Sequence, residues 1–264
     1  MKKCALINDL SGFGKCSLGV GIPIISVLGI EAHPMPTAVL SAQTGYSSYE
    51  KVDLTEYMPL FFKEWNKLGF LFDGVLVGYF SEEKQVDAVL DFVKNSNALL
   101  LVDPVMGDDG QRYDGFTDAL CEKIKTLALS ADIVTPNVTE LMLLTGESDV
   151  QKGAEILLSN GVQSVVVTGI KKDNKIGNAV FEKNRCEMFY SDFYEGGSYS
   201  GTGDMLASIV MGKVLSGNDI FSAVQTATEF ISLVIKNSNV QNRNDGVDFE
   251  KYLYRLGMEN YEKE

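Results

Sequence analysis

Short apolar runs bounded by turn residues alternate along this chain with longer stretches in which apolar residues recur at helical spacing. The short runs predict buried strands at 4–8, 31–36, 74–78, 98–104, 132–136 and 162–169, with a hairpin at 177–190. The longer stretches predict helices at 17–28, 53–67, 82–94, 115–128, 138–145, 151–159, 203–215, 219–237 and 248–256. The chain therefore belongs to the α/β class.

Strands and helices that alternate in this way form βαβ units, so a mainly parallel central sheet with helices on both faces is expected. No repeat, low-complexity segment or linker interrupts residues 1–264, which predicts a single domain. Asp53 and Glu56 have the spacing of a capping box, which predicts that a helix starts there. The hairpin and residues 31–50 are candidates for a small flap or lid.

The charge balance narrows the choice of partners. Lys and Arg number 23 and Asp and Glu number 36, a formal net charge of −13. Such a surface repels nucleic acids and anionic membranes, but a nucleotide can still bind where backbone amides converge. No stretch approaches the roughly 20 apolar residues that cross a bilayer, and the N-terminus lacks the apolar core of a signal peptide. A cytoplasmic protein is expected.

Cysteine and histidine usage disfavours two further kinds of site. Cys4, Cys16, Cys121 and Cys186 lie far apart without a CxxC pair, which argues against a zinc site or a disulfide framework. His33 is the single histidine, so a catalytic triad or a histidine metal site would rest on it alone. We expect His33 at a strand end or in a pocket wall, and we expect the chemistry to depend on carboxylates.

The segment NDLSGFGKCS (8–17) follows the first predicted strand and resembles a P-loop. In parallel sheets ligands bind beyond the carboxyl ends of the strands, where this loop would lie. A P-loop, however, needs glycine where Asp9 stands and Ser or Thr where Cys16 stands. A carboxylate at that position would repel a phosphate, so we predict that the triphosphate binds elsewhere.

A second glycine-rich loop, GTGD (201–204), directly precedes a long apolar helix. Glycines bring backbone amides close to a ligand, and the N-terminus of a helix adds partial positive charge, which together predict an anion hole. Asp204 would then be the general base for a hydroxyl that attacks the γ-phosphoryl group of ATP. The alternative is that Asp204 is only a helix-capping residue.

Acidic and amide side chains follow two further strands. DPVMGDDG (103–110) carries Asp103, Asp108 and Asp109, and TPNVTE (135–140) carries Asn137 and Glu140. Such residues often only cap helices or form turns. Together with an anion hole at the same edge, they are accounted for by magnesium held between carboxylates and phosphate oxygens.

GTGD at the start of a helix, after DPVMGD and TPNVTE in this order, resembles the ribokinase-like superfamily. Within it the chain is most similar to the pyridoxal (vitamin B6) kinases and the related hydroxymethylpyrimidine kinases. The resemblance covers about residues 5–212 and implies a ribokinase-like three-layer sandwich with a small flap. SAQTGY (41–46) and VGYFS (77–81) favour the pyridoxal kinases.

The resemblance implies an ATP-dependent, Mg²⁺-dependent phosphorylation of the 5′-hydroxymethyl group of pyridoxal, pyridoxine or pyridoxamine. Asp204 would be the general base, and the amides of Gly201, Thr202 and Gly203 would stabilise the transferring phosphoryl group. The resemblance leaves a monovalent cation such as K⁺ open as a further cofactor. It also implies a homodimer, formed through the region after the first strand and the flap.

The resemblance also assigns the binding residues. The residues along ATP would be Asp103, Asn137, Glu140 and Thr168. The residues that hold magnesium, partly through water, would be Asp103, Asp108 and Glu140. The B6 ring would contact Thr44, Tyr79 and either Asp9 or Ser11. The adenine would lie over residues 233–246, between the last two helices.

Two departures from the family pattern leave questions open. A serine early in the first loop of the family aligns with Asp9 by spacing but with Ser11 by identity. A cysteine that some relatives carry just before GTGD is Ser200 here, so a thiol trap for the pyridoxal aldehyde is not expected. Hydroxymethylpyrimidine kinase is the nearest alternative function. A non-catalytic vitamer-binding protein is disfavoured by the intact Asp204, and a sugar kinase by the first loop.

Overall fold

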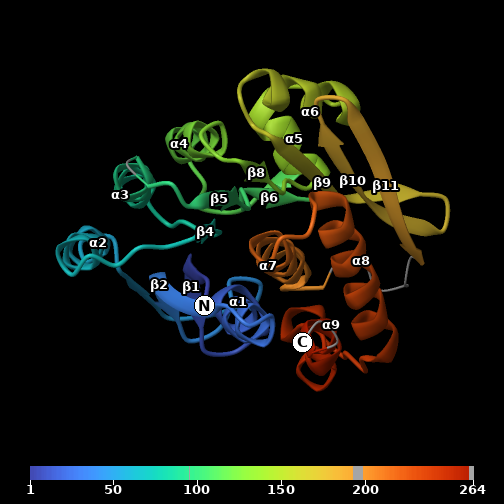
Figure 1. The fold of residues 1–264 in the computed structure, drawn as a ribbon, viewed down its shortest axis with the longest axis horizontal. Helices are drawn as coiled ribbons and strands as arrows, with labels where there is room; N and C mark the ends of the chain where they lie inside the picture. The colour runs from blue at the N-terminus through green and yellow to red at the C-terminus, as the bar shows by residue number, and fades with distance from the viewer. Residues whose placement is uncertain (95, 193–198, 262–264) are drawn as a thin grey trace.

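The computed structural model describes residues 1–94, 96–192 and 199–261. Nine strands in this part of the chain form one sheet, in the order β11-β10-β9-β8-β5-β4-β1-β2-β3 (Figure 1). The strands are β1 (Lys3–Ser11), β2 (Glu31–Leu40), β3 (Lys51–Asp53), β4 (Gly74–Val77), β5 (Leu99–Val102), β8 (Ile133–Val134), β9 (Ser164–Lys172), β10 (Lys175–Glu182) and β11 (Arg185–Asp192). The six central strands run parallel, whereas β3, β10 and β11 run antiparallel to their neighbours.

Helices cover both faces of the sheet, so the predicted three-layer sandwich is confirmed (Figure 1). One face carries α1 (Ser17–Val27), α7 (Thr202–Leu215), α8 (Ile220–Asn237) and α9 (Tyr254–Tyr261). The other carries α2 (Met58–Lys67), α3 (Glu83–Val93), α4 (Asp118–Ala128), α5 (Val138–Thr145) and α6 (Val150–Ser159). Alternate residues of a strand face opposite layers, so Leu6 packs in the first core while Ala5 and Ile7 pack in the second.

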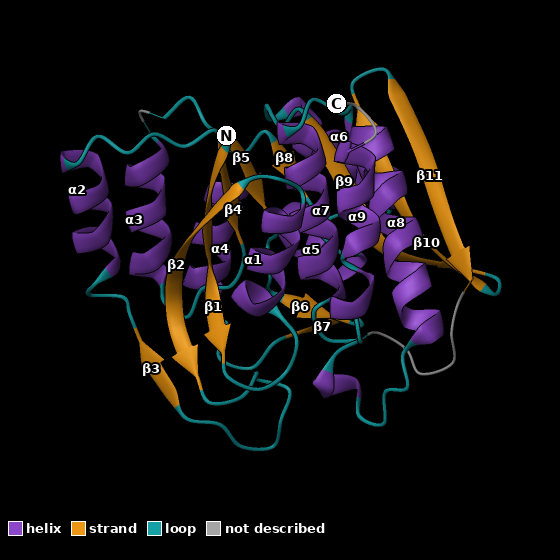
Figure 2. Cartoon of the chain, turned by 60° about the horizontal axis from the view of Figure 1, so that its bottom comes forward, coloured by secondary structure: helices purple, strands orange, loops and turns teal. Residues whose placement is uncertain are grey.

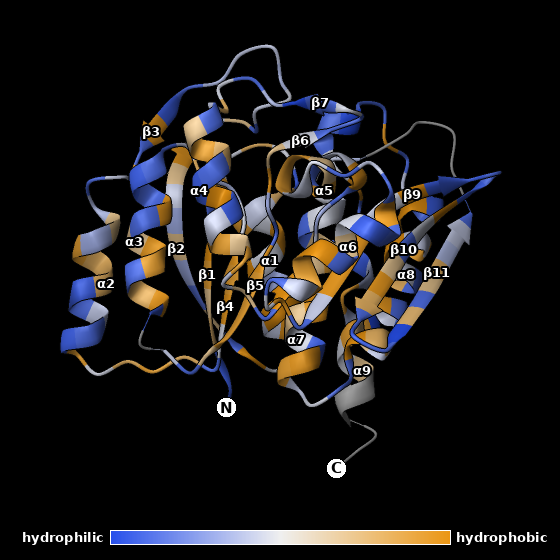
Figure 3. Ribbon diagram, turned by 90° about the horizontal axis from the view of Figure 1, so that it is seen from above, coloured by the Kyte–Doolittle hydropathy of each residue, from blue (hydrophilic) through white to orange (hydrophobic). Residues whose placement is uncertain are grey.

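The central strands β4 and β5 are apolar along their length, which Figure 3 shows in orange. A parallel strand that is buried on both faces has no polar side, and this explains the continuous apolar runs in the sequence. The polar groups of the molecule therefore gather at the ends of the strands. In Figure 2 the strands β1 and β2 end at the lower edge, where long loops and the small hairpin of β6 (Gly107–Asp108) and β7 (Gln111–Arg112) lie.

Several predicted boundaries differ from the structure. The helix predicted at 53–67 is confirmed as α2, but its predicted start is wrong. The helix begins at Met58, whereas Asp53 ends β3 and its carboxylate accepts the amide of Thr55 at 2.8 Å and the hydroxyl of Ser81. Residues 31–40 form β2 inside the sheet, so only residues 41–50 remain as a flap. The predicted hairpin at 177–190 is confirmed as β10 and β11. The predicted helix at 248–256 is instead a 3-10 turn (Glu250–Tyr252) followed by α9.

Candidate active site

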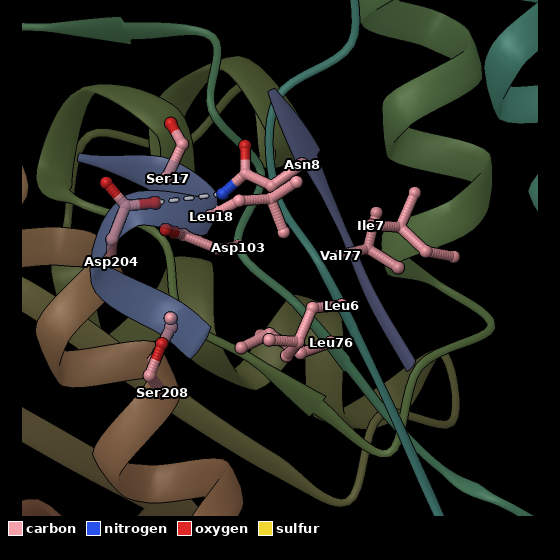
Figure 4. A pocket seen from close by; sticks show the side chains of 13 residues that line it. Leu6, Ile7, Asn8, Ser17, Leu18, Leu76, Val77, Asp103, Asp204 and Ser208 are labelled. Atoms are coloured by element: carbon pink, nitrogen blue, oxygen red, sulfur yellow. Dashed lines mark hydrogen bonds between the residues drawn. The ribbon is translucent and has the colours of Figure 1, made fainter. Parts of the chain in front are cut away.

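Asp204 lies in the first turn of α7 and points back toward the end of β1 (Figure 4). The side-chain amide of Asn8, at the end of β1, donates a hydrogen bond to Oδ1 of Asp204 at 2.9 Å. The backbone amide of Ser17, at the start of α1, donates a second. Three segments that lie far apart in the sequence therefore fix the orientation of this carboxylate.

Burial raises the pKa of Asp204 to about 6, and the charge of Asp9 contributes in the same direction. The hydrogen bonds from Ser17 and Asn8 oppose the shift, because they stabilise the ionised form. A general base is most effective when its pKa lies near the working pH. The environment of Asp204 therefore suits a base that accepts a proton from an alcohol near neutral pH.

Gly201 allows the chain to turn into α7 directly above the first loop. Its φ is 82°, and a Cβ atom there would lie 1.9 Å from the carbonyl oxygen of Lys15. No other residue type fits this position. The first amides of α7 have no partner within the helix. The amide of Thr202 donates to the carbonyl oxygen of Tyr199, just before the helix, at 3.3 Å. Gly203 is exposed, and only Oδ2 of Asp103 would come within 4 Å of a Cβ there, at 3.8 Å.

Asp103 follows β5 and faces the same loop. Its Oδ1 accepts the hydroxyl of Thr135 at 3.1 Å. Burial, together with the charge of Asp204, raises the pKa of Asp103 to about 7, and the hydrogen bond from Thr135 opposes the shift. Two carboxylates close together are costly when both are ionised. A cation or a cation-bound phosphate between them would offset this cost.

Asn137 and Glu140 tie the start of α5 to the loop after β5. Their side chains form a capping box, in which Glu140 accepts the amide of Asn137 at 2.8 Å and Asn137 accepts the amide of Glu140 at 2.9 Å. Glu140 also accepts the amide of Met106 at 3.1 Å, and Asn137 donates to the carbonyl of Gly107 at 2.8 Å. Burial raises the pKa of Glu140 well above its usual value. Much of the acceptor capacity of Glu140 is thus used in holding the loop.

A cavity of about 740 Å³ lies along this edge of the sheet. Its volume is typical of sites that bind a nucleotide-sized ligand. Thr168 reaches it through a bridge between β9 and the backbone of Asn137. All the residues predicted by name for catalysis, ATP and magnesium line it: Asp103, Asp108, Asn137, Glu140, Thr168, Gly201, Thr202, Gly203 and Asp204. A much smaller space, about 10 Å³, lies beneath Asp204 and is shown in Figure 4.

Across residues 1–94, 96–192 and 199–261, no three His, Cys, Asp or Glu side chains gather closely enough to hold a metal ion by themselves. Magnesium, however, is commonly held by one or two carboxylates together with water and the phosphates of a substrate. Asp103 fits this mode, because it faces the anion hole and, among the residues that the structure describes, accepts a side-chain hydrogen bond from Thr135 alone. Asp108 is half-buried in the cavity wall and accepts the amide of Asp109 at 2.9 Å.

The residues predicted to contact the substrate ring lie on the other side of Asp204. Asp9 is buried, and its two oxygens accept the hydroxyls of Ser17 at 2.5 Å and Ser11 at 2.8 Å. The pairing of β1 with β2 shifts register between Asn8 and Leu10, at Asp9. Asp9 and Ser11, between which the sequence left the choice open, are therefore bonded to each other.

Tyr79 and Thr44 differ in their surroundings. Tyr79 is half-buried, its ring meets the edge of Phe116 at 5.9 Å, and its amide donates to Asn8 at 2.9 Å. Thr44 is exposed and lies outside the described lining of the large cavity. Tyr79 also lies outside that lining, but its backbone amide binds the same Asn8 that donates to Asp204, whereas Thr44 belongs to the flap.

The model of one family, phosphomethylpyrimidine kinase, matches residues 63–248 of the chain. The chain belongs to this family. It is 33% identical to a proposed phosphomethylpyrimidine kinase of Bacteroides thetaiotaomicron that was crystallised with pyridoxal; the match has a TM-score of 0.91 and covers 97% of this chain and 95% of that one.

Two named pyridoxal kinases are also similar to this member of the phosphomethylpyrimidine kinase family. The structure of the Lactobacillus plantarum enzyme is 26% identical, with a TM-score of 0.92 and 99% of both chains covered. The Dictyostelium discoideum enzyme is 27% identical over 271 residues, 88% of this chain and 84% of that protein. The predicted relationship to the ribokinase-like pyridoxal kinases is confirmed, as is the predicted class of small-molecule kinase.

Two residues of this family member were missed in the sequence. Asn8 follows an apolar run, and nothing in its neighbours indicates that it binds Asp204. Arg243 lines the large cavity from a segment whose sequence offers no motif, between α8 and α9. Both are brought to the site by the tertiary fold, and no local pattern in the sequence indicates either of them.

Proposed function

We propose that this protein transfers the γ-phosphoryl group of ATP to the 5′-hydroxymethyl group of a B6 vitamer: pyridoxal, pyridoxine or pyridoxamine. The observation that carries the proposal is Asp204, a carboxylate with a near-neutral pKa at the N-terminus of a helix that opens into a nucleotide-sized cavity. The pyridoxal in the crystals of the Bacteroides relative supports the vitamer as the acceptor. Tyr79, whose backbone amide binds Asn8, would supply an aromatic surface for such a ring.

In the proposed reaction the hydroxyl oxygen of the vitamer attacks the γ-phosphorus, and the bond from that phosphorus to the β-phosphate oxygen breaks. Asp204 accepts the hydroxyl proton, so the products are the 5′-phosphate, ADP and a protonated Asp204 that returns its proton to water. The amides of Gly201, Thr202 and Gly203 stabilise the charge on the transferring group. Positioning and electrostatic stabilisation supply most of the catalysis in such transfers.

Magnesium would be held by Asp103, with Asp108 and Glu140 contributing through water. When bound, it would neutralise charge on the phosphates. The raised pKa of Asp103 supports this placement, because a buried carboxylate next to a second one favours a nearby cation. Any need for a monovalent cation such as K⁺ stays a prediction.

Hydroxymethylpyrimidine kinase is the second candidate, and the name of the matching family favours it. Its substrate is also a flat heterocycle with a CH₂OH arm, so the same base and anion hole would serve. A non-catalytic vitamer-binding protein would not need a base with a near-neutral pKa at this position.

The homodimer expected from the sequence belongs to the same proposal. Large apolar side chains are exposed at the end of β1, on β2 and β3 and on the flap, at Leu10, Phe13, Val39, Tyr49 and Val52. These positions coincide with the surface that the resemblance assigned to the dimer. Light scattering at several concentrations would measure the assembly. No helix in the described part of the chain is long and apolar enough to cross a membrane.

A panel of acceptors tests the function. The purified protein is assayed with MgATP and, in turn, pyridoxal, pyridoxine, pyridoxamine, hydroxymethylpyrimidine and its phosphate. We expect kcat/KM to be highest for one of the three vitamers. A higher value for either pyrimidine would replace the first candidate by the second, and binding of pyridoxal without turnover of any acceptor would favour the non-catalytic alternative.

A further inference from the structure

The large cavity is lined by many acidic side chains and few basic ones. Its carboxylates come from Asp103, Asp108, Asp109, Glu140, Asp192 and Asp204. Its cations are Lys171 and Arg243. A polyphosphate that enters such a cavity needs positive charge beyond the metal that accompanies it.

Lys171 is already paired. Its Nζ lies 3.1 Å from a carboxylate oxygen of Asp109, and both side chains are well exposed. Arg243, by contrast, makes no ion pair or side-chain hydrogen bond within residues 1–94, 96–192 and 199–261. Among those residues, the Arg243 guanidinium is the cation of the cavity lining that is not already in an ion pair.

The backbone around Arg243 fixes it at the phosphate end of the cavity. The amide of Ser200, the residue before GTGD, donates to the carbonyl oxygen of Arg243 at 3.2 Å. The next turn is held from the other side, because the amide of Lys15 donates to the carbonyl of Asp245 at 3.2 Å. Arg243 is thus attached to the loop whose amides form the anion hole.

The charge of Arg243 also affects the opposite wall of the cavity. Burial raises the pKa of the Tyr113 hydroxyl and acidic neighbours raise it further, while the charge of Arg243 opposes them. Tyr113 lies on the loop that carries Asp108. Arg243 and the acidic wall that carries Asp108 and Tyr113 thus line the same cavity as GTGD, where the phosphates would lie.

We propose that Arg243 binds the β- and γ-phosphates of the nucleotide and is the principal protein side-chain cation of that subsite. The inference rests on the proposed function, since it assumes a nucleotide in this cavity. A guanidinium can hold two phosphate oxygens at once in a planar fork, and such charged hydrogen bonds are stronger than neutral ones. Arg243 takes no part in the proton transfer, because Asp204 accepts the hydroxyl proton. Its contribution is therefore to the affinity for the nucleotide and to the alignment of the phosphates.

The test compares Arg243→Ala, Arg243→Lys and a matched control, Arg255→Ala. Arg255 is exposed on α9, above the ring of Tyr254. Its substitution by Ala removes the same charge from the molecule as Arg243→Ala does. Titration calorimetry measures the binding of a non-hydrolysable ATP analogue and of AMP, each with Mg²⁺ and without acceptor. For Arg243→Ala we expect about a tenfold or greater loss of affinity for the ATP analogue and less than about a twofold change for AMP. Arg243→Lys should lie between, and Arg255→Ala should match the wild type.

Unchanged affinity of Arg243→Ala for the analogue would overturn the inference, as would an equal loss for the analogue and AMP. A third contrary result is that Arg243→Ala raises only the KM for hydroxymethylpyrimidine phosphate. Arg243 would then bind the phosphate of the acceptor and not that of ATP. If Arg243→Ala unfolds, Arg243→Gln keeps the size of the side chain and is used instead. Because binding is measured without acceptor, failure of the vitamer assay and failure of this inference are separate results.

Discussion

Two glycine-rich loops, each preceding a helix, serve different purposes in this protein. In the first, before α1, the glycines allow close packing on the flap: a Cβ at Gly12 would lie 3.0 Å from the carbonyl oxygen of Ser41, and one at Gly14 would lie 2.6 Å from the side chain of Gln43. In the second, before α7, Gly201 packs on Lys15, but Gly203 stays open to the cavity. Of the two loops, the second therefore presents backbone to the large cavity.

The helix that follows each loop shows the same difference. The N-terminus of α1 already has two carboxylates against it, because Asp9 accepts the hydroxyl of Ser17 and Asp204 accepts its amide. A phosphate would be repelled there, and the positive end of α1 instead favours the ionised form of the candidate base. The first loop thus supports the site from below, while the start of α7 remains available for the anion.

The largest effect is expected from Asp204→Asn, which keeps the shape of the side chain but removes the base. We predict a fall in kcat of about a thousandfold, within the usual range for general-base catalysis. Affinity for the ATP analogue should stay within about threefold, because the anion hole is intact. Steady-state kinetics and calorimetry measure the two effects. Turnover that persists at the wild-type rate would exclude Asp204 as the base.

Gly201→Ala should give the next largest effect, because its Cβ would meet the carbonyl of Lys15 at 1.9 Å and the loops would have to separate. We predict a loss of about a hundredfold in kcat/KM and a lower melting temperature. Gly217→Ala is the matched control: its φ of 92° is equally unfavourable for alanine, but no atom lies within 4 Å of the Cβ position. If both variants lose the same activity, the contact between the loops does not position the anion hole.

Asn8→Ala tests the hydrogen bond to Asp204 through the pH profile. The donated bond stabilises the ionised carboxylate and so lowers its pKa; without it the pKa rises above the wild-type value of about 6. The acidic limb of kcat/KM should therefore move to higher pH, with about a tenfold loss at pH 6 that becomes smaller at pH 8.5. Asn8→Asp should move the limb further, because it adds a like charge. A limb that stays in place in both variants would contradict this role.

The architecture was predictable because it depends on local patterns. Apolar runs identify the buried strands, and GTGD before an apolar helix identifies the anion hole. Boundaries failed where a side chain had two possible uses: Asp53 has the spacing of a helix cap, yet it ends β3 and accepts the hydroxyl of Ser81. Its partner is 28 residues away in the sequence, and no local pattern reveals it.

The residues of the site were likewise predictable where a local pattern places them, and not where a contact between distant residues does. Asp103, Asn137 and Glu140 were found because each follows a parallel strand, and such strands end at one edge of the sheet. Arg243 was missed because it is delivered by the connection between α8 and α9, where no strand sets its position. The flap is likewise joined to this connection by contacts between distant residues, such as the 2.6 Å hydrogen bond from Asn244 to the carbonyl of Gly45.

Lys15→Ala is expected to have the smallest effect, and it examines the first loop directly. Lys15 stands where a P-loop would carry its phosphate-binding lysine, but its Nζ lies 3.0 Å from both Asp248 and Glu250. These ion pairs are partly exposed, so their loss should cost about 1 kcal/mol or less, a few degrees in melting temperature. KM for ATP should change by less than about twofold, whereas Arg243→Ala should raise it about tenfold. A larger rise in KM for ATP in Lys15→Ala than in Arg243→Ala would contradict the assignment of the phosphates to the second loop. The cation that binds the phosphates would then belong to the first loop.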